Sequence, residues 1–157
     1  SPIVYLLYPI PKIVFVPLVL LFFGVGDLPK IIMIFSILFF QIVVLVRDAA
    51  FGIPAELVLS VRSLGARTAA LWRFVYIPAL LPAVLCAVRQ SIGTAVAVLY
   101  ITELFATRLG LGYYIHLQGS TLMDYPAMYA GIVAMSLLGL LLFAIVGLLE
   151  KRLLHYR

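Results

Sequence analysis

Charged residues are scarce in this sequence, and their scarcity argues against a soluble domain. Asp, Glu, Lys and Arg make up 11% of its 157 residues and hydrophobic residues 66%, whereas about 25% of a typical soluble domain is charged. The formal net charge of +5 does not indicate a nucleic-acid-binding protein, because the basic residues stand at the ends of apolar runs and form no continuous patch. The composition predicts an integral membrane protein surrounded by the lipid bilayer.

Residues with reactive chemistry are also scarce. The sequence contains one cysteine, Cys86, which excludes a disulfide bond within the chain. It has no G-x-x-x-x-G-K-S/T motif, so we expect no ATP bound through a phosphate loop. No cluster of Asp, Glu and His has the spacing of a metal site, and no nucleophile–base pair is evident. We expect neither catalysis nor a metal ion or cofactor in this chain.

Long uncharged runs dominate the sequence and predict a single domain, 1–157, with four membrane-spanning helices. An α-helix needs about 20 residues to cross a hydrocarbon core about 30 Å thick. Pro17 predicts a kink in the first span. Because the sequence starts inside an apolar stretch and without an initiator methionine, we expect further spans upstream. The predicted spans are residues 9–24, 30–47, 82–106 and 127–149.

The basic residues predict the orientation of these spans. Four spans that alternate in direction place the loop 48–78 and the C-terminus on the same side of the membrane. Lys30 and Arg108 fall on the opposite side. Because loops rich in Lys and Arg stay in the cytoplasm, we expect the loop and the C-terminus to be cytoplasmic. Eight basic residues fall on their side: Lys12, Arg47, Arg62, Arg67, Arg73, Lys151, Arg152 and Arg157.

The segment Leu57–Pro82, LVLSVRSLGARTAALWRFVYIPALLP, is basic and amphipathic. Its apolar residues recur at spacings of three and four, which predicts a helix with one apolar face. Gly65 interrupts this helix, and Pro78 and Pro82 mark the change to the next one. From the residues alone, two interpretations stay open. The segment is either a helix at the membrane surface whose arginines reach the headgroups, or an element that docks on a partner protein.

Gly65 is followed after nine residues by Val75, Ile77 and Pro78. This spacing resembles the cytoplasmic loop of the permease subunits of ATP-binding-cassette importers, whose signature is E-A-A, three residues, G, nine residues and I-x-L-P. The chain departs from the signature in its first part, because the E-A-A positions hold Leu59, Ser60 and Val61.

Other stretches resemble the nitrate, sulfonate and taurine branch of these permeases. The resemblance implies an all-α integral membrane fold, a type I importer permease-like helical bundle with at least four transmembrane helices and a cytoplasmic coupling helix. It also implies a bacterial or archaeal inner membrane and a dimer with a second, identical permease subunit. The matching stretches are KIVFVPLVLLFFGVGDLPK (12–30), 82–89, Thr102-Glu103, Gly110-Leu111-Gly112-Tyr113, and the last span with its basic tail.

The resemblance further implies a mode of action. The coupling helix docks into a separate ATPase subunit that carries the ATP and Mg, and an extracytoplasmic substrate-binding protein delivers a small solute such as nitrate, a sulfonate or taurine. Two alternatives are an ion-coupled transporter or channel subunit without an ATPase, and a scaffold that only anchors partners. The residues that the resemblance places in coupling are Arg62, Ser63, Leu64, Gly65, Ala66, Arg67 and Pro78.

Three residues of the predicted span 82–106 are candidates for the translocation pathway or its gate. A charge inside a span costs at least about 2.5 kcal/mol, so Arg89 lines a cavity, reaches toward the headgroups or forms an internal salt bridge. Glu103 is either part of an outer gate or subunit contact, or a plain interfacial carboxylate. Gly93 indicates a close helix contact or a kink.

Overall fold

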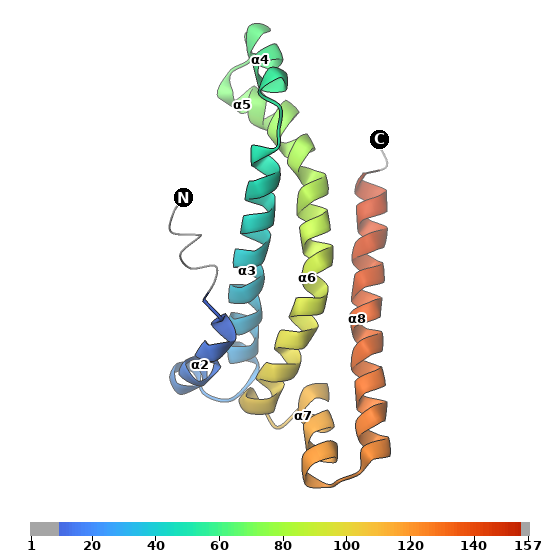
Figure 1. Cartoon of the computed structure of the whole chain (residues 1–157). Helices are drawn as coiled ribbons and strands as arrows, with labels where there is room; N and C mark the ends of the chain where they lie inside the picture. The colour runs from blue at the N-terminus through green and yellow to red at the C-terminus, as the bar shows by residue number, and fades with distance from the viewer. Residues whose placement is uncertain (1–9, 155–157) are drawn as a thin grey trace.

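The computed structural model describes residues 10–154, and every element within this range is a helix. Three long helices, α3 (Asp27–Phe51), α6 (Ile77–Ala106) and α8 (Tyr125–Leu153), run side by side with α6 in the middle (Figure 1). All three are long and apolar enough to cross a membrane. The predicted all-α membrane fold is therefore confirmed.

The first described segment is shorter than the predicted span 9–24, whose first residue lies outside the described range. η1 (Lys12–Phe15) and α2 (Val16–Phe23) contain 4 and 8 residues, which together extend about 18 Å. An extended residue, Pro11, precedes η1, and Gly24, with a φ of 73°, ends α2. The described part of this segment therefore covers only part of a membrane's thickness, beside one half of α3 (Figure 1).

The middle helix is longer than the predicted span 82–106. α5 (Thr68–Leu71) and the π-helix η2 (Trp72–Tyr76) continue directly into α6, so one helical rod reaches from Thr68 to Phe105. Pro78 lies where η2 joins α6, and Pro82 removes a single backbone hydrogen bond inside the helix. The expected change of helix is found only in part: the π-helix ends and α6 begins beside Pro78, but the helical rod continues through both prolines.

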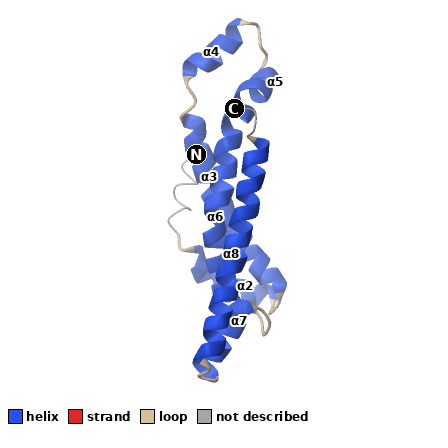
Figure 2. Ribbon diagram, turned by 90° about the vertical axis from the view of Figure 1, so that its right-hand side faces the viewer, coloured by secondary structure: helices blue, strands red, loops and turns tan. Residues whose placement is uncertain are grey.

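The connections gather at the two ends of the long helices. α4 (Ala55–Ser63) and α5 extend beyond one end, which we call the loop end, and the C-terminal end of α8 points the same way (Figures 1 and 2). α7 (Leu111–His116) and the π-helix η3 (Leu117–Thr121) lie at the opposite end, which we call the α7 end, and α7 packs against α6 and α8.

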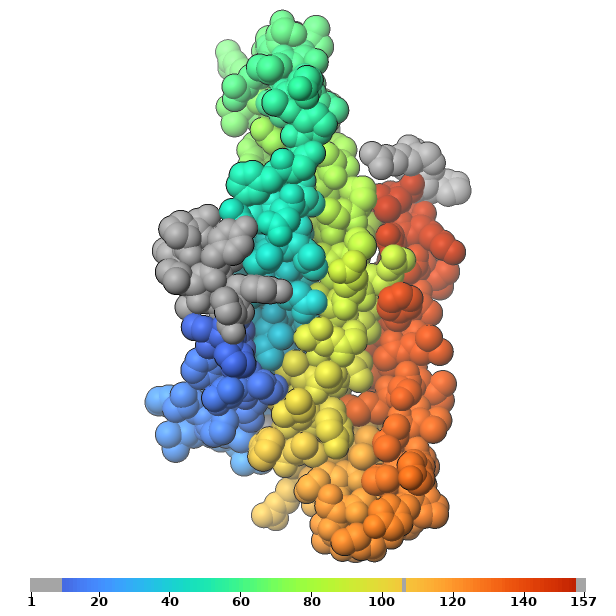
Figure 3. Space-filling model, viewed as in Figure 1, coloured from blue at the N-terminus to red at the C-terminus, as the bar shows by residue number. Residues whose placement is uncertain are grey.

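The helices bury little of their apolar surface against one another. Val16, Met33 and Val98 form a buried cluster between α2, α3 and α6. Most of α8 lies on the surface of the open row of helices (Figure 3), and the buried residues in it are Gly131 and Met135. Exposed Leu, Ile and Phe side chains cover the rest of its length. Such a surface is stable only in contact with lipid or with further protein.

Candidate functional site

The loop end carries a sharp helix–turn–helix, with Gly65 in the turn between α4 and α5. Gly65 has a φ of 81°, and its N–H donates to the carbonyl of Arg62 at 2.9 Å. Arg67 is extended, and its carbonyl accepts the N–H of Ala70 at 2.9 Å as α5 begins. Because the left-handed conformation of Gly65 strains any residue with a Cβ, the reversal of the chain depends on glycine at this position.

The side chains of this turn are exposed and of mixed character. Leu64, at the turn itself, is 86% exposed. Ser63 is exposed, but its hydroxyl donates to the carbonyl of Ser60 at 2.8 Å and so is used within α4. Arg62 and Arg67 are exposed on either side, and Ala66 is half-buried. The structure brings six of the predicted coupling residues together as one tip: Arg62, Ser63, Leu64, Gly65, Ala66 and Arg67.

Pro78, the seventh predicted coupling residue, lies beneath the tip. It lines an apolar hollow of about 400 Å³, to which Leu57 of α4 and Leu153 of α8 also contribute. The hollow therefore joins the loop, the start of α6 and the end of α8. Pro78 shapes the base of the loop and is not part of its exposed tip.

Glu56, which no sequence pattern marks as functional, lies in the first turn of α4. It is exposed, and its carbonyl accepts the hydroxyl of Ser60 at 2.7 Å. A carboxylate at this place interacts favourably with the positive end of the helix dipole. Glu56 precedes Leu59 by three residues, which is about one helical turn. The loop therefore carries a carboxylate one turn before the position at which the signature has its glutamate.

Glu103 lies at the α7 end, where three helices meet. It is 6% exposed; its Oε1 lies 3.8 Å from the Nζ of Lys30 in α3, and its Oε2 accepts the backbone N–H of Gly112 in α7 at 2.7 Å. Lys30 is itself buried and also pairs with Asp27 at 2.7 Å. Glu103 is therefore more than an interfacial carboxylate, because it joins α3, α6 and α7. Its role in an outer gate stays a prediction.

The glycines of the G-L-G stretch fit closely around this carboxylate. A Cβ at Gly112 would meet the carbonyl oxygen of Tyr100 at 2.9 Å and the Cβ of Glu103 at 3.0 Å. At Gly110, which has a φ of 126°, a Cβ would overlap the Glu103 carboxylate itself. Only glycine at both positions lets the chain fold this closely over the buried acid.

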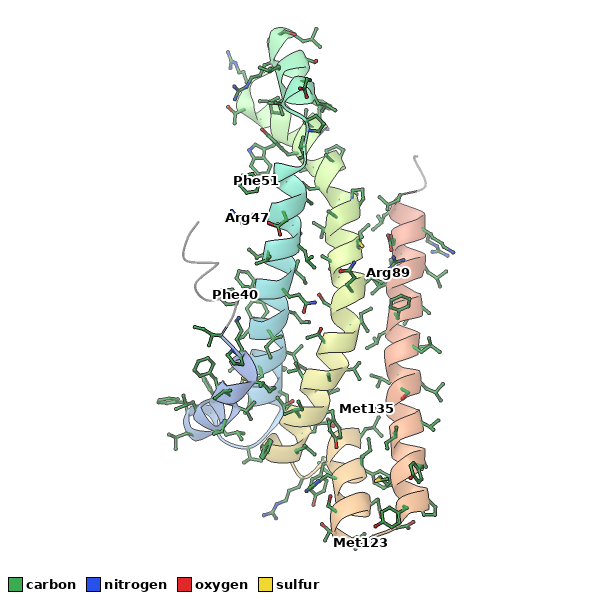
Figure 4. All side chains as sticks on the ribbon, viewed as in Figure 1. Phe40, Arg47, Phe51, Arg89, Met123 and Met135 are labelled. Atoms are coloured by element: carbon green, nitrogen blue, oxygen red, sulfur yellow. The ribbon has the colours of Figure 1, made fainter. Side chains whose placement is uncertain are left out.

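Arg89 forms an internal salt bridge, which is one of the three interpretations that the sequence left open for its charge. Its Nη1 lies 3.0 Å from the Oε2 of Glu150 in α8, and its guanidinium lies over the ring of Phe143, 5.6 Å from the centroid (Figure 4). The sequence could not identify this partner, because its pattern marks Glu150 only as the residue that ends the last predicted span. The pair connects α6 to α8, and a role of Arg89 in a gate stays a prediction.

Gly93 does not form the expected close helix contact. Among the described residues, no heavy atom outside its own stretch of helix lies within 4 Å of the position that a Cβ would take there, and α6 passes through Gly93 without interruption. Gly93 lies about 6 Å along the helix from Arg89 and about 15 Å from Glu103. The three candidates on α6 therefore do not form a single site, and a place for Gly93 in the pathway stays a prediction.

The distribution of basic residues predicted that Lys12 lies at the loop end, but it does not lie there. Its ammonium lies over the ring of Phe40 in α3, 4.3 Å from the centroid. Phe40 comes thirteen residues after Asp27 and eleven before Phe51, so Lys12 lies about midway along α3. The assignment is wrong because η1 begins beside the middle of the span and not at its end.

The glycine fit around Glu103 predicts the effect of one added methyl group. We expect Gly112→Ala to destabilise the protein by about 1–3 kcal/mol, because the Cβ displaces backbone and not a flexible side chain. The measurement is the temperature at which the detergent-solubilised protein loses its monodisperse elution peak. Gly147→Ala is the matched control, since no atom lies within 4 Å of a Cβ there. Equal melting temperatures for the two variants would contradict the prediction.

The salt bridge between α6 and α8 predicts non-additive effects. Arg89→Leu leaves the Glu150 carboxylate, whose side chain is 18% exposed, without its cation, and we expect a loss of about 1–3 kcal/mol, less than for a fully buried pair. The double variant Arg89→Leu/Glu150→Leu leaves no charge and should recover part of that loss, measured by the same melting assay. If the two single variants simply add in the double variant, the pair contributes no coupling.

Comparisons with known proteins agree with this architecture. A family model described as "Binding-protein-dependent transport system inner membrane component" matches residues 1–155. A probable ABC transporter permease of Brucella abortus is 30% identical to this chain over 94% of its length. The taurine transport system permease of Escherichia coli is 29% identical over 98% of the chain. The riboflavin transport system permease of Chloroflexus aurantiacus is 31% identical over 94% of the chain. The chain spans 59%, 55% and 54% of these relatives. The chain therefore belongs to the family of binding-protein-dependent transport system inner membrane components.

Proposed function

We propose that this chain is the membrane-spanning part of an importer driven by ATP hydrolysis on a separate ATP-binding-cassette subunit. The observation that carries the proposal is the family match together with the exposed turn between α4 and α5. The chain has no phosphate-loop motif of its own, so the ATP and Mg belong to the partner. The chain itself then acts as a permease and not as an enzyme.

The tip residues are suited to docking in a cleft of the ATPase. Leu64 is available as an apolar anchor, and the flanking Arg62 and Arg67 can pair with carboxylates of the partner. Glu56 adds one negative charge to a loop that is otherwise basic. In this role the tip is the coupling element, and Pro78 sets the angle at which the loop leaves the membrane.

Movement of the tip reaches the membrane through a continuous helical rod. α5, η2 and α6 form one helix of 38 residues from Thr68 to Phe105, about 57 Å long. A continuous helix transmits a displacement at the loop end toward the membrane, and it bends most easily near the loop, at η2 and the two prolines. Closure of the ATPase around ATP then moves α6, and the access of the solute site changes from one side of the membrane to the other.

The charge distribution supports an inner-membrane orientation with the loop end in the cytoplasm. The described basic residues of the loop end are Arg47, Arg62, Arg67, Arg73, Lys151 and Arg152, whereas Lys30 and Arg108 lie at the α7 end. In this orientation the α7 end faces an extracytoplasmic substrate-binding protein. The exposed apolar surface of α8 and of α3 then meets lipid, further spans of the protein, and a second copy of the permease in a homodimer.

The solute is proposed as a small water-soluble compound. Relatives are named for taurine and riboflavin, so membership of the family alone does not fix its chemistry. Nitrate, sulfonates and taurine are the first candidates, because the sequence resembles the branch that carries them.

Uptake into proteoliposomes tests the proposal. The full-length permease, its ATPase and its binding protein should take up radiolabelled taurine or another candidate solute only when ATP and Mg²⁺ are present on the side of the ATPase. Uptake that persists without the ATPase or ATP would instead support the ion-coupled alternative. Uptake that requires ATP but not the binding protein would contradict the proposed partner at the α7 end.

Charge reversal at the tip is expected to uncouple the two subunits. Arg62→Glu and Arg67→Glu should each lower ATP-driven uptake about tenfold, the effect of losing a central interface contact of 1–2 kcal/mol, while the variant protein still elutes normally in detergent. Arg152→Glu, at the exposed end of α8, is the matched control and should leave uptake unchanged. Normal uptake by both tip variants would show that the turn is not the coupling element.

A further inference from the structure

The exposed surface at the middle of α6 differs from that of the neighbouring helices. Near the middle of α3 and of α8, large apolar side chains such as Phe39 and Leu141 are 49% and 62% exposed. Between residues 80 and 104 of α6, no large apolar side chain is exposed to this extent, and the exposed residues are Gln90, Gly93 and Ala97. The middle of α6 therefore presents small and polar groups where its neighbours present surface suited to lipid.

Two polar side chains of this surface are short of hydrogen-bond partners. The side-chain amide of Gln90 donates to the thiol of Cys86 at 3.4 Å and makes no other hydrogen bond with the described residues. The hydroxyl of Thr94 makes none with them, although those of Ser91 and Thr102 each donate to a carbonyl of α6. The amide oxygen of Gln90 and the hydroxyl of Thr94 are therefore able to bind a further group.

These groups lie on one side of α6, which we call the polar strip. Its members recur at spacings of three and four and so share one helix face: Cys86, Gln90, Gly93, Thr94 and Ala97. Val98, one position after Ala97, is buried against Met33 of α3, and Arg89, one position before Gln90, pairs with Glu150 of α8. Because successive residues are turned by about 100° around a helix, the polar strip faces outward between the sides that contact α3 and α8.

The polar strip lies at a depth where lipid is a poor neighbour. Gln90 and Thr94 are about 2 and 4 Å from the midpoint of α6 (Ile77–Ala106), too far from either end to reach the headgroups. An amide or hydroxyl without a partner is unfavourable in hydrocarbon. Polar residues within membrane spans therefore face other protein or a water-filled cavity.

The polar strip also belongs to the helix that the tip would move. α6 continues α5 and η2 in one rod from Thr68 to Phe105, so a displacement at the loop end shifts Gln90 and Thr94 together. Gly93 between them leaves space, because no atom of another element lies within 4 Å of the position of a Cβ there. A polar, open face on a moving helix is what a solute requires in order to cross the middle of the membrane.

We propose that the polar strip lines a water-filled route of the solute, and that the Gln90 amide and the Thr94 hydroxyl exchange hydrogen bonds with the solute as it passes. The inference rests on the proposed import function. An amide and a hydroxyl each donate and accept, so the solute is a small polar compound that carries both donors and acceptors. Neutral hydrogen bonds hold such a compound weakly enough for it to leave again.

The reactivity of single thiols tests whether water reaches the polar strip. In the full-length transporter, reconstituted with its ATPase and binding protein, every native cysteine is replaced by serine; Cys86→Ser keeps an acceptor for Gln90. Thr94→Cys then places one thiol on the polar strip, and Leu141→Cys places one on the exposed apolar surface of α8. The two positions lie at a similar depth, because a Cβ at Gly139 of α8 would contact Val96 of α6 at 3.5 Å.

Sulfonatoethyl methanethiosulfonate transfers its thioalkyl group to a thiolate and releases methanesulfinate. We expect it to modify Thr94→Cys at least about tenfold faster than Leu141→Cys, because the reactive thiolate is disfavoured in hydrocarbon. The cationic trimethylammonioethyl reagent should give the same order. With ATP and vanadate, the side of the vesicle from which the reagent reaches position 94 should change. Equally slow modification of both variants would show that lipid or dry protein contact covers the polar strip, and would overturn the proposal.

Removal of the hydroxyl tests the contact with the solute. Thr94→Val keeps the shape of the side chain and should lower the uptake rate at limiting solute concentration about fivefold, the effect of one neutral hydrogen bond. Thr94→Ser keeps the hydroxyl and should transport nearly as well as the wild type. Ser136→Ala is the matched control, since the Ser136 hydroxyl already donates to a carbonyl of α8. Taurine is the first solute used, followed by the other candidates until the wild type shows uptake. Unchanged uptake by Thr94→Val would contradict the proposed contact.

Failure of this inference is distinguishable from failure of the proposed function. Uptake that depends on ATP, with position 94 unreactive from both sides, would overturn the route and leave the import proposal standing. Uptake without ATP, with position 94 reactive, would overturn the import proposal and leave the route standing.

Discussion

The carboxylate of Glu103 is the interaction on which the arrangement of the helices depends most. It is buried, and its two oxygens contact Lys30 of α3 and the backbone of Gly112 in α7. A buried carboxylate without partners costs several kcal/mol, so α3, α6 and α7 are held together at this end by the need to satisfy one acid. The tight fit of Gly110 and Gly112 follows from the same constraint.

This fixed end determines what a displacement at the loop end can do. The rod from Thr68 to Phe105 contains Glu103 near its far end, so pushing the loop either bends the rod or separates Glu103 from Lys30. Bending is easiest near the loop, where η2 has the wide turn of a π-helix and Pro78 and Pro82 lack their N–H donors. Nearer the middle, the pair Arg89–Glu150 makes α8 follow α6.

The sequence predicted those features that depend on local pattern. The spacing from Gly65 to Pro78 indicated the loop, and the uncharged run before Glu150 indicated α8. What it could not predict depends on long-range packing: Arg89 meets Glu150, sixty-one residues later. Lys12 was misplaced because a lysine beside an apolar run looks the same whether the helix begins at the membrane surface or in its middle. The open surroundings of Gly93 likewise follow from which helices α6 contacts.

The buried cluster of α2, α3 and α6 connects the helical rod to the first described segment of the chain. Val98 of α6 packs against Met33 of α3 and Val16 of α2, and Met33 also lines a hollow beside Lys12. Because close-packed side chains transmit displacement and do not absorb it, a shift of α6 moves Met33 and changes the wall of that hollow. A displacement of the rod therefore reaches α3 and α2 through one continuous chain of contacts: Val98, Met33 and Val16.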